Sequence, residues 1–211
     1  MNYFGHFVIA SWVTKDVGSH FGAMLPDFCA MARVAIPECL PPSTHHGLSL
    51  HYRSDEAFHL CPVFQNLCSS GTRRLIELGL TRGPARAASH VGLELLLDGV
   101  LAREPSARHG YVRTLADPLG GRAQWTGEGP LAELLSRLRE RGVDGSHFEV
   151  PALFFRLQRA LGRHRRLALV AADERAVSHW LEEAQPQLDA AAPALLAAVR
   201  DAVTEPGHHA S

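Results

Sequence analysis

The apolar stretch at residues 89–99 is interrupted by an ionisable residue at every fourth position. These residues are His90, Glu94 and Asp98. Positions four apart lie on nearly the same face of an α-helix, so the three side chains form one polar stripe on an otherwise apolar helix. Because an isolated buried carboxylate is costly, the fold must supply the stripe with a partner.

A second polar stripe has the same spacing in residues 51–59. His51, Asp55 and His59 recur at positions i, i+4 and i+8. Two such helices packed face to face would bring several nitrogen and oxygen ligands to one point, as in the metal sites of helical bundles. The two matching triads therefore predict a metal site between two helices.

Helical patterns dominate the rest of the chain, and alternation typical of strands is nearly absent. We predict an all-α, single-domain bundle of about seven or eight helices over residues 1–204, followed by a flexible tail at residues 205–211. Residues 104–129 are rich in glycine and proline, and we expect them to form a long surface connection. The last two helices are expected at about residues 166–185 and 187–203, with Trp180 as a core anchor.

Composition excludes some classes of partner. The 21 Lys and Arg residues are balanced by 22 Asp and Glu residues, so no global charge favours a nucleic acid or an anionic membrane. The four cysteines show no C-x-x-C pair and no regular disulfide spacing, and no apolar stretch has the length of a membrane-spanning helix. We therefore expect a cytoplasmic protein with neither a nucleic-acid nor a membrane partner.

Two further polar residues, His6 and Asp27, lie among hydrophobic neighbours near the start of the chain. A buried aspartate is hydrogen-bonded, paired or bound to a metal, although Asp27 could instead be the N-cap of a helix that begins after Pro26. The complete set of candidate metal ligands is His6, Asp27, His51, Asp55, His59, His90, Glu94 and Asp98. Such a mixed set suits Mn, Fe, Zn or Mg, and phosphoester hydrolysis is the simplest chemistry that it supports.

Four short blocks resemble one known family, the acyl carrier protein phosphodiesterases, which are HD-domain-like metal-dependent phosphohydrolases. Residues 1–6 resemble its Met-Asn-aromatic-x-x-His opening, and residues 22–28 resemble its Gly-Asn-x-x-x-Asp-Phe block. Residues 51–55 resemble its His-x-Arg-x-Asp block, and residues 94–101 are similar to its Asp-x-x-x-Asp-His-x-Leu block. The blocks occur in the family's order over the first half of the chain.

The resemblance implies an HD-domain-like, Mn²⁺-type hydrolase that removes the 4′-phosphopantetheine arm from an acyl carrier protein, or that cleaves a related small phosphoester. Carried over position by position, it implies metal or catalytic roles for His6, Asp27, His51, Asp55 and Asp98. It also implies that Arg53 faces the phosphate, so that the catalytic residues are Asp55, Arg53 and Asp98.

The sequence departs from the family pattern at three positions. Glu94 replaces an aspartate, Gly99 replaces the histidine of the family's Asp-His pair, and His59 stands where the family has a second acid. His90 lies one helical turn before Glu94 and is placed to substitute for the missing histidine. These departures concern the substrate more than the fold.

Two other functions remain open from the sequence. A ligand set rich in histidine could hold a di-iron centre, because some HD-domain proteins are oxygenases, and the cofactor would then be Fe rather than Mn²⁺ or Zn²⁺. The chain could also be a non-catalytic helical binding protein whose polar stripes satisfy one another. Metal content separates these interpretations, since only the enzymes require a metal.

Overall fold

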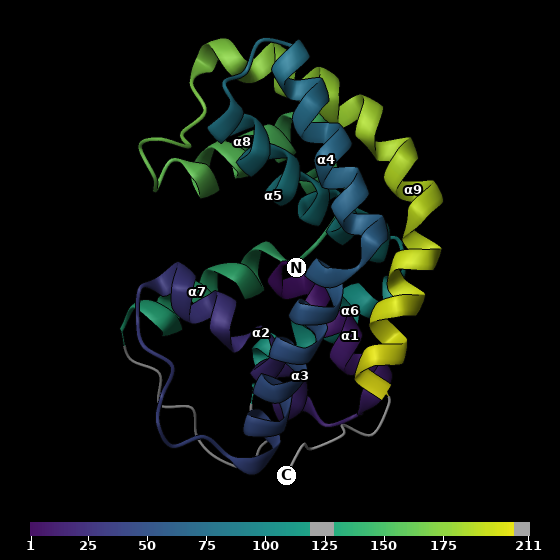
Figure 1. Ribbon diagram of the computed structural model, residues 1–211. Helices are drawn as coiled ribbons and strands as arrows, with labels where there is room; N and C mark the ends of the chain where they lie inside the picture. Colours follow the sequence, from purple (N-terminus) through teal and green to yellow (C-terminus); the bar gives the residue numbers. More distant parts are fainter. Residues whose placement is uncertain (119–128, 205–211) are drawn as a thin grey trace. The chain divides into compact units, whose positions relative to one another are not determined.

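The computed structural model describes residues 1–118 and 129–204, and these residues are entirely helical with connecting turns (Figure 1). The predicted all-α class is confirmed, with nine α-helices among the described residues where about seven or eight were expected. The helices are α1 (Tyr3–Val13), α2 (Val17–Ala32), α3 (Pro42–Leu60), α4 (Pro62–Glu77), α5 (Arg82–Leu101), α6 (Pro105–Ala116), α7 (Pro130–Arg141), α8 (Val150–Leu161) and α9 (Glu174–Thr204). Two short 3₁₀ helices, η1 (Gly145–Phe148) and η2 (Ala171–Asp173), precede α8 and α9.

The chain divides into two compact units, and each is built from separate stretches of sequence. Unit 1 comprises Met1–His59, Glu104–Val143 and the chain from Ala197 onward, and unit 2 comprises Leu60–Arg103 and Asp144–Leu196. The single domain expected over residues 1–204 stays a prediction. The expected tail at residues 205–211 lies outside the described residues.

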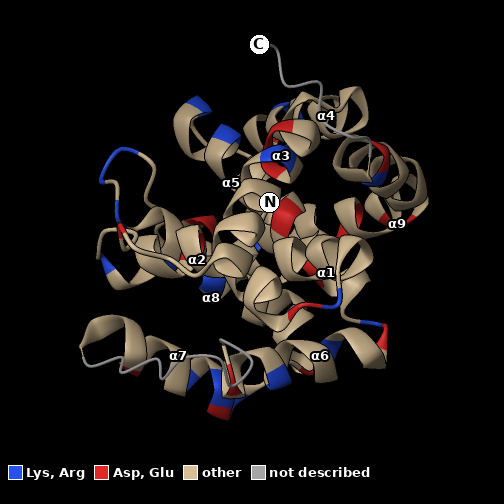
Figure 2. Ribbon diagram, turned by 90° about the horizontal axis from the view of Figure 1, so that it is seen from below, with Lys and Arg blue, Asp and Glu red and all other residues tan. Residues whose placement is uncertain are grey.

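Helix α1 lies at the centre of unit 1. It contains no Lys, Arg, Asp or Glu and is drawn wholly in tan in Figure 2. Asn2 caps its first turn, and every residue from Phe4 to Ala10 is buried. Its aromatic side chains pack on α6, where the ring of Phe4 meets that of Tyr111 edge-on at 5.5 Å. Burial of this apolar helix carries His6 into the interior of unit 1.

Helices α2 and α3 approach each other so closely that their backbones touch. A Cβ atom added at Gly22 would overlap the carbonyl oxygen of Thr44, and one added at Gly47 would overlap that of Ser19. Only glycine permits this approach at either position. The crossing brings the middle of α3, where His51 lies, against the backbone of α2.

Unit 2 is organised around Trp180 of α9, which is 3% exposed. The ring packs on the glycine faces of α4 and α5, because a Cβ atom at Gly71 would lie 3.1 Å from the ring and one at Gly92 would lie 2.6 Å from it. The expected role of Trp180 as a core anchor is confirmed. No helix among the described residues is both long enough and apolar enough to cross a membrane.

Residues 105–116 form α6, so the expectation of an irregular connection over residues 104–129 is wrong for this part. Glu104 caps the helix by accepting a hydrogen bond from the backbone nitrogen of Ser106, and Pro105 occupies the first turn, where proline is favoured. The buried side chains of Tyr111 and Leu115 pack the helix into the interior of unit 1. Residues 119–128 of the expected connection lie outside the described residues.

The C-terminal region forms one long helix, α9, where two helices were expected, so that expectation is wrong as well. The helix continues through Pro186 and Pro193. Leu181, Leu188 and Leu195 recur at seven-residue intervals, and each is fully buried. Burial of this continuous stripe outweighs the hydrogen bonds that the prolines remove.

Candidate metal centre

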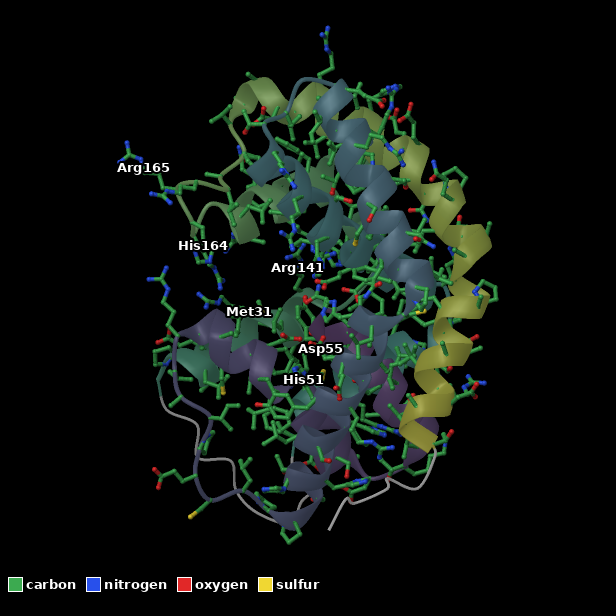
Figure 3. All side chains as sticks on the ribbon, in the orientation of Figure 1. Met31, His51, Asp55, Arg141, His164 and Arg165 are labelled. Carbon is green, nitrogen blue, oxygen red and sulfur yellow. The ribbon has the colours of Figure 1, made fainter. Side chains whose placement is uncertain are left out.

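Three helices of unit 1 each contribute one metal-binding side chain to a common point. His6 comes from α1, Asp27 from α2 and His51 from α3, and one ligand atom of each lies within 4.8 Å of the other two. His6 is 1% exposed and His51 is 7% exposed, so both histidines are buried, and Asp27 is half-buried. Figure 3 labels His51 together with its neighbour Asp55 on α3. Of the eight candidate ligands, these three are the ones that unit 1 brings together as a cluster.

Asp27 reaches the cluster from the interior of α2. The helix begins at Val17 with Asp16 as its N-cap, and Pro26 lies inside it. The alternative interpretation of Asp27 as the N-cap of a helix is therefore wrong. A carboxylate within a mostly buried helix needs a cationic or hydrogen-bonding environment, and the cluster of candidate ligands supplies a place for a cation.

The ring of His51 is held in one tautomer by the α2 backbone. Its Nδ1 lies 2.8 Å from the carbonyl oxygen of Ala23. A carbonyl oxygen only accepts hydrogen bonds, so Nδ1 carries the proton and Nε2 carries the lone pair. A hydrogen bond of this kind behind a ring is the usual support of a metal-binding histidine.

The ring of His6 has polar neighbours at both nitrogens. Nδ1 lies 2.9 Å from Oγ of Ser54. Nε2 lies 3.1 Å from the carbonyl oxygen of Met1 and 3.5 Å from Oδ1 of Asp55. The rings of His6 and His51 lie 3.9 Å apart between centroids and are tilted by 34°. The two imidazoles therefore lie together as candidate ligands.

Burial keeps both imidazoles neutral. It lowers the pKa of His6 to about 3, against the opposing effect of the nearby Asp55, and it also lowers the pKa of His51. Metals bind the neutral form of imidazole, so no proton has to leave either ring at neutral pH. Both imidazoles therefore have a lone pair available for a cation at neutral pH.

Asp55 lies beside the cluster, one turn after His51 on α3. Burial alone would raise the pKa of this carboxyl, but contacts with His59, His6 and the amino group of Met1 hold its pKa well below the usual range. The distances from its Oδ1 are 3.3 Å to Nε2 of His59 and 2.7 Å to the Met1 nitrogen. A carboxylate that stays ionised attracts cations but is a poor proton acceptor.

Arg53 points to the end of α9 within unit 1. Its Nη2 donates a hydrogen bond of 2.8 Å to the carbonyl oxygen of Ala202. That carbonyl belongs to the last turn of α9, where helix carbonyls lack a partner within the helix. The structure therefore gives Arg53 a helix-capping contact, and its expected contact with a phosphate stays a prediction.

The polar stripe of α5 belongs to unit 2, and its carboxylates have nitrogen-bearing partners there. Glu94 lies 3.1 Å from Nε2 of His90, and the buried Asp98 lies 3.6 Å from Nη2 of Arg156 on α8. Gly99 faces Phe148, which a Cβ atom at this position would approach to 3.2 Å. The expected convergence of the two stripes stays a prediction, because α5 and the α3 triad belong to different units.

Two supporting groups of the cluster were not among the residues identified from the sequence. Ser54 follows His51 by three positions and so lies on the same side of α3, which is a usable signal for a supporting residue. The carbonyl oxygen of Ala23 leaves no trace in a sequence, because every residue carries one. Only the close approach of α2 and α3 reveals its contact with His51.

The donor set of the cluster is two neutral imidazoles and one carboxylate. Three protein ligands of these types are found in catalytic zinc sites and in mononuclear iron sites, where further coordination positions stay open. The set therefore fits a catalytic divalent metal by its chemistry. No model of a known protein family, no curated protein and no solved structure matches the chain.

Proposed function

We propose that unit 1 binds a divalent metal ion through His6, Asp27 and His51, and that the protein is a metal-dependent phosphoester hydrolase. The observation that carries this proposal is the convergence of three ligand atoms within 4.8 Å from three separate helices. The resemblance to the acyl carrier protein phosphodiesterases supports it, since all three residues fall in the blocks that carry that resemblance. Mn²⁺ is the proposed metal.

A divalent metal at this place would polarise a phosphoryl oxygen and lower the pKa of a bound water. The chain's own residues provide the setting. Burial keeps His6 and His51 neutral, and the hydrogen bond from His51 Nδ1 to Ala23 directs the free Nε2 away from the α2 backbone. Asp55 remains ionised next to His6 and adds negative charge that favours a cation.

The proposed substrate class is a phosphodiester, with the 4′-phosphopantetheine arm of an acyl carrier protein as the first candidate. The departures at Glu94 and Gly99 leave room for a related small phosphoester. Arg53 has no assigned part in the proposal, because its guanidinium is bonded to Ala202.

The first test is the metal content of the purified protein and of matched variants, measured by elemental analysis after incubation with Mn²⁺. Wild type is expected to hold metal, and Asp27→Asn and His51→Gln are expected to lose it. His20→Gln is the matched control: His20 is also a buried histidine of unit 1, but its Nε2 bonds to the carbonyl oxygen of Thr14. Equal metal content in all four proteins would contradict the proposed ligand set.

The second test is hydrolysis. Mn²⁺-loaded wild type is expected to cleave bis(p-nitrophenyl) phosphate and to release phosphopantetheine from a holo-acyl carrier protein, followed by mass spectrometry. Asp27→Asn is expected to lose both activities, and His20→Gln is expected to keep them. Metal binding without hydrolysis of either substrate would overturn the proposed reaction but not the metal site.

One observation favours a second candidate, an iron-dependent oxygenase. Two histidines and one carboxylate are the donor set of mononuclear Fe(II) oxygenases. This candidate predicts selective retention of iron by protein prepared without oxygen, and oxygen consumption when air is admitted. Hydrolysis with Mn²⁺, together with no oxygen consumption by the iron form, would decide for the hydrolase. A protein that holds no metal under any of these conditions would fit only a non-catalytic role.

A further inference from the structure

Ser54 occupies a buried position on α3 between the two histidines of the cluster. Its side chain is 1% exposed. The Oγ atom lies 2.9 Å from Nδ1 of His6 and 2.9 Å from the backbone carbonyl oxygen of His51. One hydroxyl therefore bridges the rear of the His6 ring and the main chain of the residue that carries the second imidazole.

The number of available protons determines how this bridge works. The hydroxyl of Ser54 has one proton, and the carbonyl oxygen of His51 can only accept a hydrogen bond. When the hydroxyl donates to that carbonyl, Nδ1 of His6 must donate to Oγ. Neutral His6 also has one ring proton, so its Nε2 is then left with a lone pair.

The geometry points to Ser54 as a positioning residue that fixes the tautomer of His6 and keeps its Nε2 available for the metal. The inference deepens the proposed function and rests on it, since it concerns the same site. Under this inference both histidines are held by a hydrogen bond at Nδ1. His51 donates to the carbonyl oxygen of Ala23, and His6 donates to Oγ of Ser54. Both Nε2 atoms then carry lone pairs.

Loss of the hydroxyl favours a competing arrangement of His6. Its Nε2 lies 3.1 Å from the carbonyl oxygen of Met1 and 3.5 Å from Oδ1 of Asp55, and either oxygen accepts a hydrogen bond if the ring proton moves to Nε2. In Ser54→Ala, Nδ1 faces a methyl group, so this second tautomer becomes the favoured one. Metal binding then requires the proton to move back, and supporting hydrogen bonds of this type are worth about 10- to 100-fold in metal affinity.

The experiment first reads the tautomer directly. Nitrogen NMR of the histidine side chains is recorded on metal-free, ¹⁵N-labelled protein, and His6→Gln identifies the His6 signals. Wild type is expected to show a protonated Nδ1 and an unprotonated Nε2 on His6, and Ser54→Ala is expected to show the reverse. A wild-type ring with its proton on Nε2 would overturn the inference.

Mn²⁺ affinity is then measured on the same proteins by competition with a chelating dye. Ser54→Ala is expected to bind at least about tenfold more weakly than wild type, and Ser54→Thr, which keeps the hydroxyl, is expected to recover most of that loss. Ser11→Ala is the matched control, because Ser11 makes the same type of bond within a helix, from Oγ to the carbonyl oxygen of Val8, but has no histidine attached. Circular dichroism verifies that each variant is folded.

The two readouts separate the inference from the proposed function. Wild type that binds no Mn²⁺ would overturn the proposed function, and the NMR signals of His6 would still decide the tautomer. Wild type that binds Mn²⁺ while Ser54→Ala binds it equally well would overturn the role of Ser54 and leave the metal site standing.

Discussion

The polar residues of α3 and α5 have the same spacing but different surroundings. On α3, His51 lies beside His6 of α1 and Asp27 of α2, so its imidazole joins ligands from two other helices. On α5, Glu94 lies beside His90 of the same helix, and Asp98 lies beside Arg156. On α3, His51 therefore joins a group of donors from other helices, whereas on α5 Asp98 belongs to an ion pair with Arg156.

The difference shows what a periodic polar stripe can and cannot indicate. Spacing of four residues places side chains on one helix face, but the neighbouring helices decide whether they meet a metal ion or a cationic side chain. A cation bound at the His6 cluster would neutralise the charge of its carboxylate. Arg156 already fills that role for Asp98.

The largest expected effect comes from breaking the ion pair of unit 2. Asp98→Asn leaves the guanidinium of Arg156 without its carboxylate, and we expect the free energy of unfolding to fall by about 4 kcal/mol in urea denaturation. Asp201→Asn, a change at an exposed carboxylate, is the control and is expected to alter stability by less than about 0.5 kcal/mol. Metal content should persist in Asp98→Asn. Its loss would show that Asp98 is a ligand, as the resemblance implies.

A somewhat smaller effect is expected at the crossing of α2 and α3. Gly47→Ala places a methyl group against the α2 backbone, so we expect a loss of about 3 kcal/mol in unfolding free energy, together with weaker metal binding. The control is Gly145→Ala, since no atom lies within 4 Å of a Cβ there. Gly92→Ala, against Trp180 in unit 2, sharpens the comparison because it should destabilise the protein without loss of metal. Unchanged metal affinity in Gly47→Ala would show that the close approach of α2 and α3 does not position the metal ligands.

The buried histidines predict a pH dependence of stability in the metal-free protein. The pKa of His6 is lowered to about 3 when folded, whereas the unfolded ring takes up a proton near its usual pKa of 6.5. Below that pH the unfolded state binds more protons, so stability falls with falling pH, by about 2 kcal/mol between pH 6.5 and pH 5. The depressed pKa of Asp55 adds a further loss only below its usual range.

Urea denaturation at several pH values in the presence of a chelator measures this slope. His6→Gln is expected to flatten it. His90→Gln is the control from the other stripe, because the side chain of His90 is 43% exposed. Equal slopes in wild type and His6→Gln would contradict the assignment of a neutral, buried His6.

The smallest expected effect is at Arg53. Arg53→Ala removes one hydrogen bond from the guanidinium to the carbonyl oxygen of Ala202, and we expect a loss of about 1 kcal/mol in unfolding free energy. Phosphodiester hydrolysis is measured on the same variant. A large fall in kcat/KM with little change in stability would place Arg53 at the substrate instead, as the resemblance implies.

Much of the fold and part of the candidate site could be predicted from the sequence. Apolar periodicity and the scarcity of strand patterns predicted the all-α class, and His6, Asp27 and His51 could be identified as polar residues within apolar segments. The partner of Asp98 could not be predicted, because Arg156 is distant in sequence and lies on another helix. Helix α9 also escaped prediction, since the burial of Leu188 and Leu195 overrides the local effect of Pro186 and Pro193.

The alternation of the two units along the chain also governs how the molecule can be divided. Unit 1 takes three stretches of sequence and unit 2 takes two, so no contiguous fragment contains one whole unit without part of the other. The proposed ligands all lie in the first stretch, but α6, α7 and the end of α9 complete the same unit from later parts of the chain. A peptide ending at His59 would hold every proposed ligand but would lack α6 and α7, which pack on α1 and α2. Limited proteolysis within either unit should therefore release pieces that recover native structure only when they are recombined.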